Sequence, residues 1–232
     1  MSNTAEQASA PLIPAPPAED RQPISLDALE AFEHVIRNRR SVRRFRPDPI
    51  PDAVIERVLQ AALWAPSPHG TQPWRFAVLT KEPTKERLAD AMAASWRHNL
   101  EMDGQPEDVI QGRLDGSRRR LLEAPVLVVI CLYAADLDHY PDPDRAAAEG
   151  TMAVQSLGAC VQNLLLAAYA QGIDAGWMCA PLFCPEIVVD ALHLDPALSP
   201  HALIAMGNAA ADPKRRPRRP LDTLVVFDDR RE

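Results

Sequence analysis

Glycine is scarce in this chain of 232 residues, and its distribution excludes two common nucleotide-binding motifs. Nine glycines are present, and no two of them stand at positions i and i+2. Neither the GxGxxG fingerprint of dinucleotide-binding folds nor the phosphate-binding loop of nucleoside triphosphatases can therefore be written anywhere. The sequence also lacks GxSxG and HExxH, which removes the simplest hydrolase and zinc-protease interpretations.

Cysteine is sparse as well, and its spacing argues against a metal or redox site. The four cysteines form no CxxC pair, and they are Cys131, Cys160, Cys179 and Cys184. Because zinc and thiol-redox sites need closely spaced ligands, we expect no metal centre and interpret all four as buried apolar thiols. A chemistry without such protein groups favours a bound cofactor as the reagent, with no dedicated catalytic side chain.

Basic residues are fewer than acidic ones: the chain has 25 Lys and Arg and 32 Asp and Glu, which gives a formal net charge of −7. This balance argues against a nucleic-acid partner, because phosphate backbones are held mainly by Lys and Arg. No window approaches the apolar run of about eighteen residues that a membrane span requires. The start of the chain does not read as a secretory signal, so we expect a cytoplasmic protein with no membrane partner.

The composition favours one folded domain behind an irregular arm. Residues 1–24 contain five prolines and no periodicity, which predicts a disordered arm rich in Pro and Ala. The remaining residues, 25–232, are apolar enough to bury one core. One predicted helix begins near Ser25, and a second follows Asp52, which is the expected N-cap. The other predicted helices are 84–100, a segment between Gly116 and Pro125, Arg145–Gln171 and Pro185–Leu192. The predicted strands are Gln72–Thr80, Pro125–Leu132, His201–Gly207 and the run TLVVF at 223–227. The apolar run Gly176–Ala180 is a further short element. The stretch 104–116 is polar and uneven and shows no clear element.

Two motifs stand out from this background. The first, RRSVRRF at 39–45, belongs to a run with six arginines between Arg37 and Arg46. Several guanidinium groups and a hydroxyl suit a phosphate monoester, although a solvated basic face is the commoner meaning of such a run. The second, APSPHGTQPW at 65–74, joins a helix end to a strand start. Its prolines stiffen a loop that could approach a flat ligand, although by itself it is only a turn.

Together these motifs resemble the nitroreductase superfamily, whose members carry an RRSxRxF box and, one helix later, an APSxxxxQPW loop. Residues 96–100, 140–142, Arg145, Glu149 and 151–162 further resemble the reductase domain fused to glutamate ligases of the deazaflavin coenzyme F-420. The resemblance covers roughly residues 33–227. It implies a three-layer α/β/α fold of the α+β class, with a mostly antiparallel central sheet, flanking helices and a long buried helix at a homodimer interface.

The resemblance also implies a site for FMN. Arg39, Arg40, Ser41 and Arg43 would hold the phosphate and ribityl chain. The contacts expected near the ring are Ser67, Pro68, His69, Gln72, Gly176 and Trp177. A last phosphate contact would come from Arg216 and Arg218, or from Lys214 and Arg216 in a shifted register. His69 would orient an acceptor, donate a proton or serve the loop structurally.

The implied activity is hydride transfer from NADH or NADPH, through FMN, to a small electrophilic acceptor. A dehydro precursor of the deazaflavin coenzyme is one candidate acceptor, and a general nitro, quinone or enone reductase is the alternative. Two hypotheses of other classes remain open, namely a flavin-binding protein without turnover and an interaction protein without a ligand. The absorption spectrum of the purified protein distinguishes them.

Overall fold

The computed structural model of the protein describes residues 13–14, 23–213 and 215–231. Most of the expected arm at 1–24, and the candidate phosphate ligand Lys214, therefore lie outside the described residues. The chain divides into two compact units, residues 1–34 and residues 35–232. The first helix, α1 (Leu26–Asn38), begins in one unit and ends in the other.

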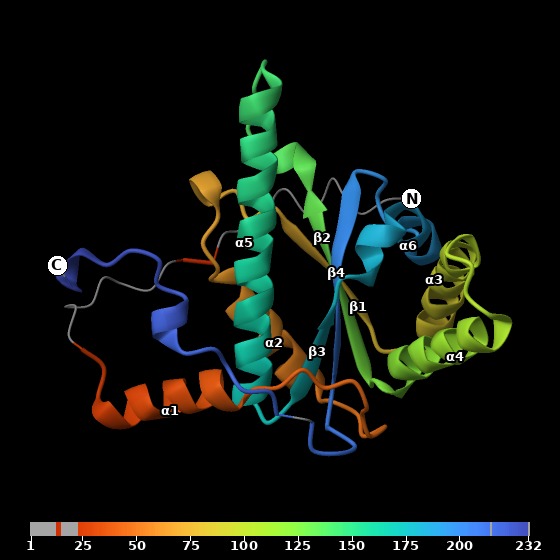
Figure 1. Ribbon diagram of the computed structural model, residues 1–232, viewed down its shortest axis with the longest axis horizontal. Helices are drawn as coiled ribbons and strands as arrows, with labels where there is room; N and C mark the ends of the chain where they lie inside the picture. Colours follow the sequence, from red (N-terminus) through yellow and green to blue (C-terminus); the bar gives the residue numbers. More distant parts are fainter. Residues whose placement is uncertain (1–12, 15–22, 214, 232) are drawn as a thin grey trace. The chain divides into compact units, whose positions relative to one another are not determined.

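A four-stranded sheet forms the centre of the larger unit, with the strand order β1-β2-β4-β3 (Figure 1). The strands are β1 (Trp74–Leu79), β2 (Val126–Tyr133), β3 (Asp174–Met178) and β4 (Leu198–Gly207). All three pairings are antiparallel, which confirms the prediction for the sheet. Strand β2 is apolar along nearly its whole length and β4 is apolar from Ala202 to Met206, as expected for strands that are covered on both faces.

Helices cover both faces of this sheet, so the predicted three layers are confirmed (Figure 1). One face packs against α2 (Asp52–Leu63) and α5 (Pro143–Ala170). The other packs against helices that the chain places before β2 and before β4, namely α3 (Glu82–Met102), α4 (Glu107–Glu123) and α6 (Pro185–Leu192). Strand β2 shows why the layers form, because alternate side chains of a strand point to opposite faces. Val128 belongs to the first core and Val129 to the second.

Helix α5 is the longest element, and it is apolar on more than one side. It packs against α2, β2 and β3, and the side chain of Asp142 caps its first turn by accepting a hydrogen bond from the backbone N–H of Arg145. Within the described residues it is the one helix whose length and composition would suit a membrane span. Because its inner face is part of the core, these properties are those of a core helix. Its outer face exposes Met152 and Val154.

The end of α4 is held by a buried lysine. Lys85 of α3 is 6% exposed, and its Nζ donates hydrogen bonds to the carbonyl oxygens of Ala124, at 2.8 Å, and Leu122, at 3.4 Å. These carbonyls lie at the last turn of α4, where helix geometry leaves acceptors without partners. Burial lowers the pKa of the Lys85 ammonium. The lysine therefore fixes the end of α4 against α3.

Four local predictions were wrong. Helix α2 begins at Asp52, with Pro51 as its N-cap residue, so Asp52 lies in the first turn, where its charge suits the helix dipole. Most of the polar stretch 104–116 belongs to α4, whose apolar side is narrow. The run at 223–227 forms no strand, because Val226 is fully exposed and pairing is what stabilises a strand. Cys179 is exposed, whereas the other three cysteines are buried as expected.

Candidate functional site

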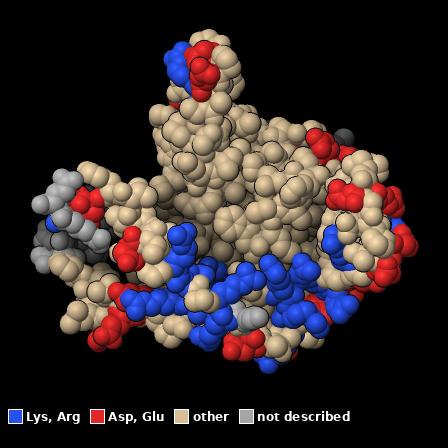
Figure 2. Space-filling model, in the orientation of Figure 1, with Lys and Arg blue, Asp and Glu red and all other residues tan. Residues whose placement is uncertain are grey.

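Two arginine-rich segments from distant parts of the chain line one cavity of about 500 Å³. The first contributes residues 39–44, after α1, and the second contributes residues 211–213 with Arg216 and Arg218, after β4. Six of the residues predicted for a phosphate line it together: Arg39, Arg40, Ser41, Arg43, Arg216 and Arg218. The space-filling view shows Lys and Arg side chains gathered in a broad band on the face that it displays (Figure 2). The structure thus brings both predicted basic motifs to one place.

Backbone hydrogen bonds fix the first of these segments beside the sheet. The N–H of Val42 donates to the carbonyl of Ala175 in β3 at 3.0 Å, and Ser41 forms a parallel bridge to the same residue. Farther along, the N–H of Arg46 donates to the carbonyl of Asn208 at 2.8 Å. The side chains of Val42 and Phe45 are buried in the core. Apolar anchors between the arginines therefore hold the guanidinium groups at a defined position.

Gly176 permits this close approach. A Cβ atom built on Gly176 would lie 2.1 Å from the carbonyl oxygen of Val42, a distance that no side chain tolerates. The glycine is therefore required where the arginine segment crosses β3. The structure gives Gly176 a packing role, while its predicted contact with a cofactor stays a prediction.

Like charges crowd the cavity. Burial, followed by the positive charges of Arg218 and Arg40, lowers the pKa of Arg39. The Nε atoms of Arg39 and Arg40 are buried and have no hydrogen-bond partner within the described residues. Arg44 differs, because its Nε donates to Glu123 Oε2 at 2.7 Å. Buried donors without acceptors are costly, so the arrangement favours an anion in the cavity.

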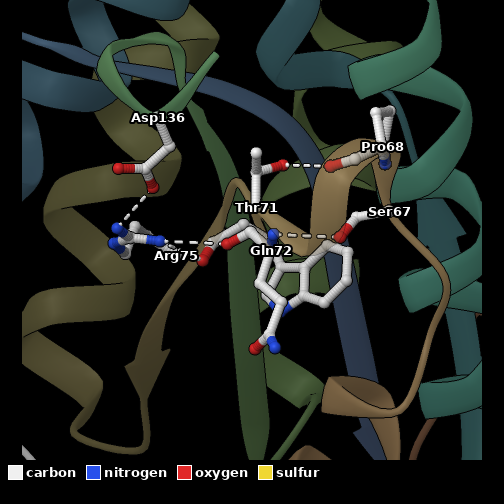
Figure 3. Close-up of polar contacts among 7 residues, drawn as sticks. Ser67, Pro68, Thr71, Gln72, Arg75 and Asp136 are labelled. Atoms are coloured by element: carbon white, nitrogen blue, oxygen red, sulfur yellow. Dashed lines mark hydrogen bonds and ion pairs between the residues drawn. The ribbon is translucent and has the colours of Figure 1, made fainter. Parts of the chain in front are cut away.

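The second motif forms a tight loop between α2 and β1 that is held by its own side chains (Figure 3). Ser67 Oγ accepts a hydrogen bond from the backbone N–H of Gln72 at 3.0 Å, and Thr71 Oγ1 donates to the carbonyl of Pro68 at 3.0 Å. His69 and Gln72 adopt left-handed backbone conformations with φ of 53° and 49°. Such conformations are uncommon for residues other than glycine and tend to gather at functional sites.

An arginine that the sequence reading missed ties this loop to the sheet. Arg75 pairs with Asp136 at 2.7 Å, donates to the carbonyls of Gln72 and Trp74, and lies 5.0 Å from the ring centroid of Tyr133 (Figure 3). Arg75 immediately follows the QPW motif, but no local pattern indicates that Asp136 is its partner. Their pairing depends on the antiparallel contact between β1 and β2, which ends near both residues.

The remaining predicted site residues do not line the arginine cavity. Its lining includes none of the residues expected near a ring, which are Ser67, Pro68, His69, Gln72, Gly176 and Trp177. His69 Nε2 is 3.5 Å from Asp138 Oδ2, and both side chains are exposed. Trp177 is 39% exposed on β3, which is an edge strand. The structure therefore groups the phosphate candidates in one cavity and leaves the ring candidates on the loop before β1 and on strand β3.

Comparison with known proteins gives a consistent result. The model of the nitroreductase family matches residues 36–208. A protein of Thermus thermophilus named NADH dehydrogenase is 31% identical over 216 residues, which are 88% of this chain and 98% of the relative. An NAD(P)H nitroreductase of Bacillus subtilis is 28% identical over 187 residues, covering 81% of this chain and 89% of the relative.

Solved structures show the same fold. The crystal structure of a Desulfovibrio desulfuricans nitroreductase in complex with FMN is similar with a TM-score of 0.65 and 28% identity, covering 85% of this chain and 96% of that chain. A BluB-like flavoprotein of Clostridium difficile has a TM-score of 0.70 at 24% identity, covering 85% of this chain and 98% of that chain. The latter similarity is one of fold alone.

Proposed function

Because this chain belongs to the nitroreductase family, we propose that it is an FMN-dependent oxidoreductase that passes hydride from NADH or NADPH, through the flavin, to a small electrophilic acceptor. The observation that carries this proposal is the convergence of Arg39, Arg40 and Arg43 with Arg216 and Arg218 on one cavity. The Desulfovibrio nitroreductase of the same fold is a complex with FMN. A flavin phosphate is a ligand that fits both the arginine cavity of this chain and the FMN complex of the related structure.

The residues present fit a flavin phosphate. A phosphate monoester carries nearly two negative charges and three acceptor oxygens at neutral pH. Arg39 and Arg40 offer buried Nε–H donors that have no acceptor among the described residues, and Ser41 also lines the cavity and offers a hydroxyl. Guanidinium groups bind phosphate through paired, charge-assisted hydrogen bonds. We assign Arg39, Arg40, Ser41, Arg43, Arg216 and Arg218 to the phosphate and the adjoining chain.

The loop between α2 and β1 is the proposed support for the flavin ring. Bound FMN supplies the chemistry of hydride acceptance and donation. Ser67 and Arg75 hold the loop in one conformation, so Pro68 and Gln72 can confine a flat ring without an ordering cost at each turnover. Gly176 and Trp177 are the proposed contacts from β3. His69, already near Asp138, would orient an acceptor or donate a proton to it.

We further propose that the protein is a homodimer. Several large apolar side chains of the larger unit are exposed, and they include Met152 and Val154 on α5 and Leu224, Val226 and Phe227 near the C-terminus. Extensive apolar exposure of this kind marks surfaces that a partner covers. Light scattering coupled to size-exclusion chromatography tests the proposal, because a species of 25.6 kDa at micromolar concentration contradicts it.

The natural acceptor separates two versions of the function. The narrower version is reduction of a dehydro precursor of the deazaflavin coenzyme, and the broader is reduction of nitro compounds, quinones or enones. Turnover of a nitroaromatic compound is compatible with both versions. Binding of the deazaflavin precursor to the FMN-loaded protein, measured by difference absorbance, decides between them, and its absence rules out the narrower version.

An absorption spectrum followed by anaerobic reduction tests the central proposal. The protein reconstituted with FMN is expected to show flavin bands, to lose them on addition of NADPH or NADH, and to regain them on addition of an acceptor such as a quinone. Flavin that binds but is not reduced would indicate a flavin-binding protein without turnover. A protein that stays colourless after FMN is offered would overturn the proposal.

A further inference from the structure

The two walls of the arginine cavity are held to the rest of the fold in different ways. The wall at 39–44 includes the buried side chain of Val42 and is followed directly by the buried Phe45. The other wall includes Arg216 and Arg218, which belong to a run, 215–220, whose residues are all exposed. One wall is therefore fixed by burial, whereas the other lies on the surface.

Hydrogen bonds show the same contrast. After β4, the N–H of Ala209 donates to Asp174 Oδ2 at 3.1 Å, and the N–H of Ala210 donates to the carbonyl of Arg44 at 3.0 Å. Within the described part of the chain, no hydrogen bond or ion pair joins residues 215–220 to another helix or strand. Segments with few contacts open at a low cost in free energy. The run 215–220 is therefore held far less firmly than the wall at 39–44.

Charge opposes the closed arrangement of the two walls. Arg216 and Arg218 line the cavity together with Arg39, Arg40 and Arg43, and none of these five has a carboxylate partner among the described residues. The effect reaches Arg39, whose pKa is lowered by burial and then by the positive charge of Arg218. Like charges repel, and an anion between them reverses the sign of the interaction. An anion in the cavity would therefore draw the exposed wall toward the anchored one.

Prolines make the exposed wall a stiff unit. Pro217 stands between the two arginines that line the cavity, and its ring fixes φ. Pro220 closes the run in an extended conformation, with φ of −59° and ψ of 147°. A chain of this kind has no internal hydrogen bonds and keeps its direction over several residues. Arg216 and Arg218 should therefore approach or leave the cavity together.

We propose that residues 215–220 form a strap that a phosphate monoester closes, with the anion bridging Arg216 and Arg218 to Arg39 and Arg40. The inference rests on the proposed function for the identity of the anion, which is the phosphate of FMN, and adds that the strap sets how long the flavin stays bound. Release requires the strap to open, whereas entry takes place through the open form. Riboflavin has no phosphate and therefore cannot close the strap.

Limited trypsin proteolysis of the full-length protein tests the closure. Trypsin cleaves after arginine unless proline follows, so its sites in the strap include the bonds after Arg215 and Arg218. Saturating FMN should slow both cleavages by about tenfold or more, because cleavage follows the population of the open form. Riboflavin should not slow them. Cleavage after Arg230, which lies outside the strap, is the internal control, and mass spectrometry of the fragments identifies each site.

The same experiment separates failure of the strap from failure of the proposed function. Equal cleavage with and without FMN, in a protein whose flavin fluorescence shows that FMN is bound, would overturn the strap. Equal protection by riboflavin would also overturn it, because the phosphate would then have no part in closure. Protection by inorganic phosphate in a protein that binds no FMN would support the strap and contradict the proposed function alone.

The kinetics of flavin binding provide a second test. In stopped-flow fluorescence, Arg218→Gln is expected to raise the dissociation rate of FMN by about tenfold, the effect of one lost charge-assisted contact, and to change the association rate by less than about twofold. Arg219→Gln removes the same charge from the adjacent position, which does not line the cavity, and is the matched control. A lower association rate with an unchanged dissociation rate would overturn the inference, because Arg218 would then attract the ligand without retaining it.

Discussion

Arg39 and Arg218 stand near opposite ends of the larger unit's sequence, yet they line the same cavity and their charges repel each other. The repulsion is built into the folded chain, because Val42 and Phe45 anchor one segment in the core. Relief of this repulsion therefore contributes to the free energy of anion binding. Neutralising either arginine should lower the affinity for the ligand more than it lowers the stability of the fold.

Arg39→Gln is expected to weaken FMN binding by about 10- to 100-fold, the effect of one lost charge-assisted hydrogen bond. Riboflavin, which has no phosphate, should bind the variant and the wild type equally. Fluorescence titration with both flavins measures the two effects. The thermal midpoint of the protein without flavin should stay the same or rise, since a half-buried cation beside other cations has been removed.

Arg219→Gln is the charge control for this experiment, because Arg219 is exposed and does not line the cavity. Its FMN affinity should remain within about twofold of the wild type, as expected for a screened surface charge. If Arg39→Gln lowered the affinity for riboflavin as much as the affinity for FMN, Arg39 would contribute to ring binding or to folding and not to phosphate binding.

Gly176→Ala should destabilise the protein and disturb the cavity at once. The new Cβ would meet the carbonyl oxygen of Val42, so the arginine segment or β3 must shift. Overpacking of this kind costs about 1–3 kcal/mol or more, measurable as a lower urea midpoint together with weaker FMN binding. Gly158→Ala is the matched control, since a Cβ there meets nothing within 4 Å and alanine favours a helix. Equal stability of the two variants would contradict the role of Gly176.

Arg75→Gln should loosen the loop at 67–73. The change removes the ion pair with Asp136 and the hydrogen bonds to the carbonyls of Gln72 and Trp74, for a loss of about 1–2 kcal/mol in unfolding free energy. Faster amide hydrogen exchange confined to the loop is the specific readout. Arg57→Gln, which removes one exposed hydrogen bond to Gln171, serves as the control and should leave the loop's exchange unchanged.

Thiol reactivity should distinguish Cys179 from the other cysteines. Burial raises the pKa of Cys131 and of Cys160 to about 12 and also raises that of Cys184. Because the thiolate is the reacting form, the folded protein at pH 8 should show one fast thiol with a disulfide reagent, and three more only after unfolding. Cys179→Ser should abolish the fast reaction. More than one fast thiol in the folded protein would show that the core is open.

The same pKa values predict how stability varies at alkaline pH. Between about pH 9, the ordinary value for a thiol, and about pH 12, Cys131 and Cys160 lose protons in the unfolded chain but keep them in the folded one. Stability should therefore fall as pH rises through this window, by up to about 1.4 kcal/mol per pH unit for each thiol. Urea midpoints measured from pH 8 to 10.5 check this slope. Cys160→Ala should reduce the slope relative to the wild type.

The sequence predicted best what local periodicity controls. Helix α6 has the predicted bounds, Pro185–Leu192, because prolines and an apolar face mark it without reference to the rest of the chain. Strand β2 was evident from its continuous apolar run. The run at 223–227 had the same local character and is not a strand, since the decisive factor is a neighbouring strand, which local composition does not report.

The arginine motif was also visible in the sequence, but its tertiary partners were not. Nothing near Glu123 indicates that the end of α4 meets Arg44. Likewise, no spacing connects Arg75 with Asp136. Charged pairs between separate elements depend on how strands and helices are arranged in space, so a single sequence reveals the charges without revealing their pairing.

Strand β3 lies at one edge of the sheet, and residues 41–42 occupy part of its outer side through the bond from Val42 to Ala175. An uncovered edge offers free backbone donors and acceptors to strands of other molecules. The segment that carries the arginines therefore also protects part of the β3 edge from pairing with strands of other molecules. If this segment detached, the exposed edge would promote aggregation, so a bound anion that stabilises residues 39–43 should keep concentrated protein in solution.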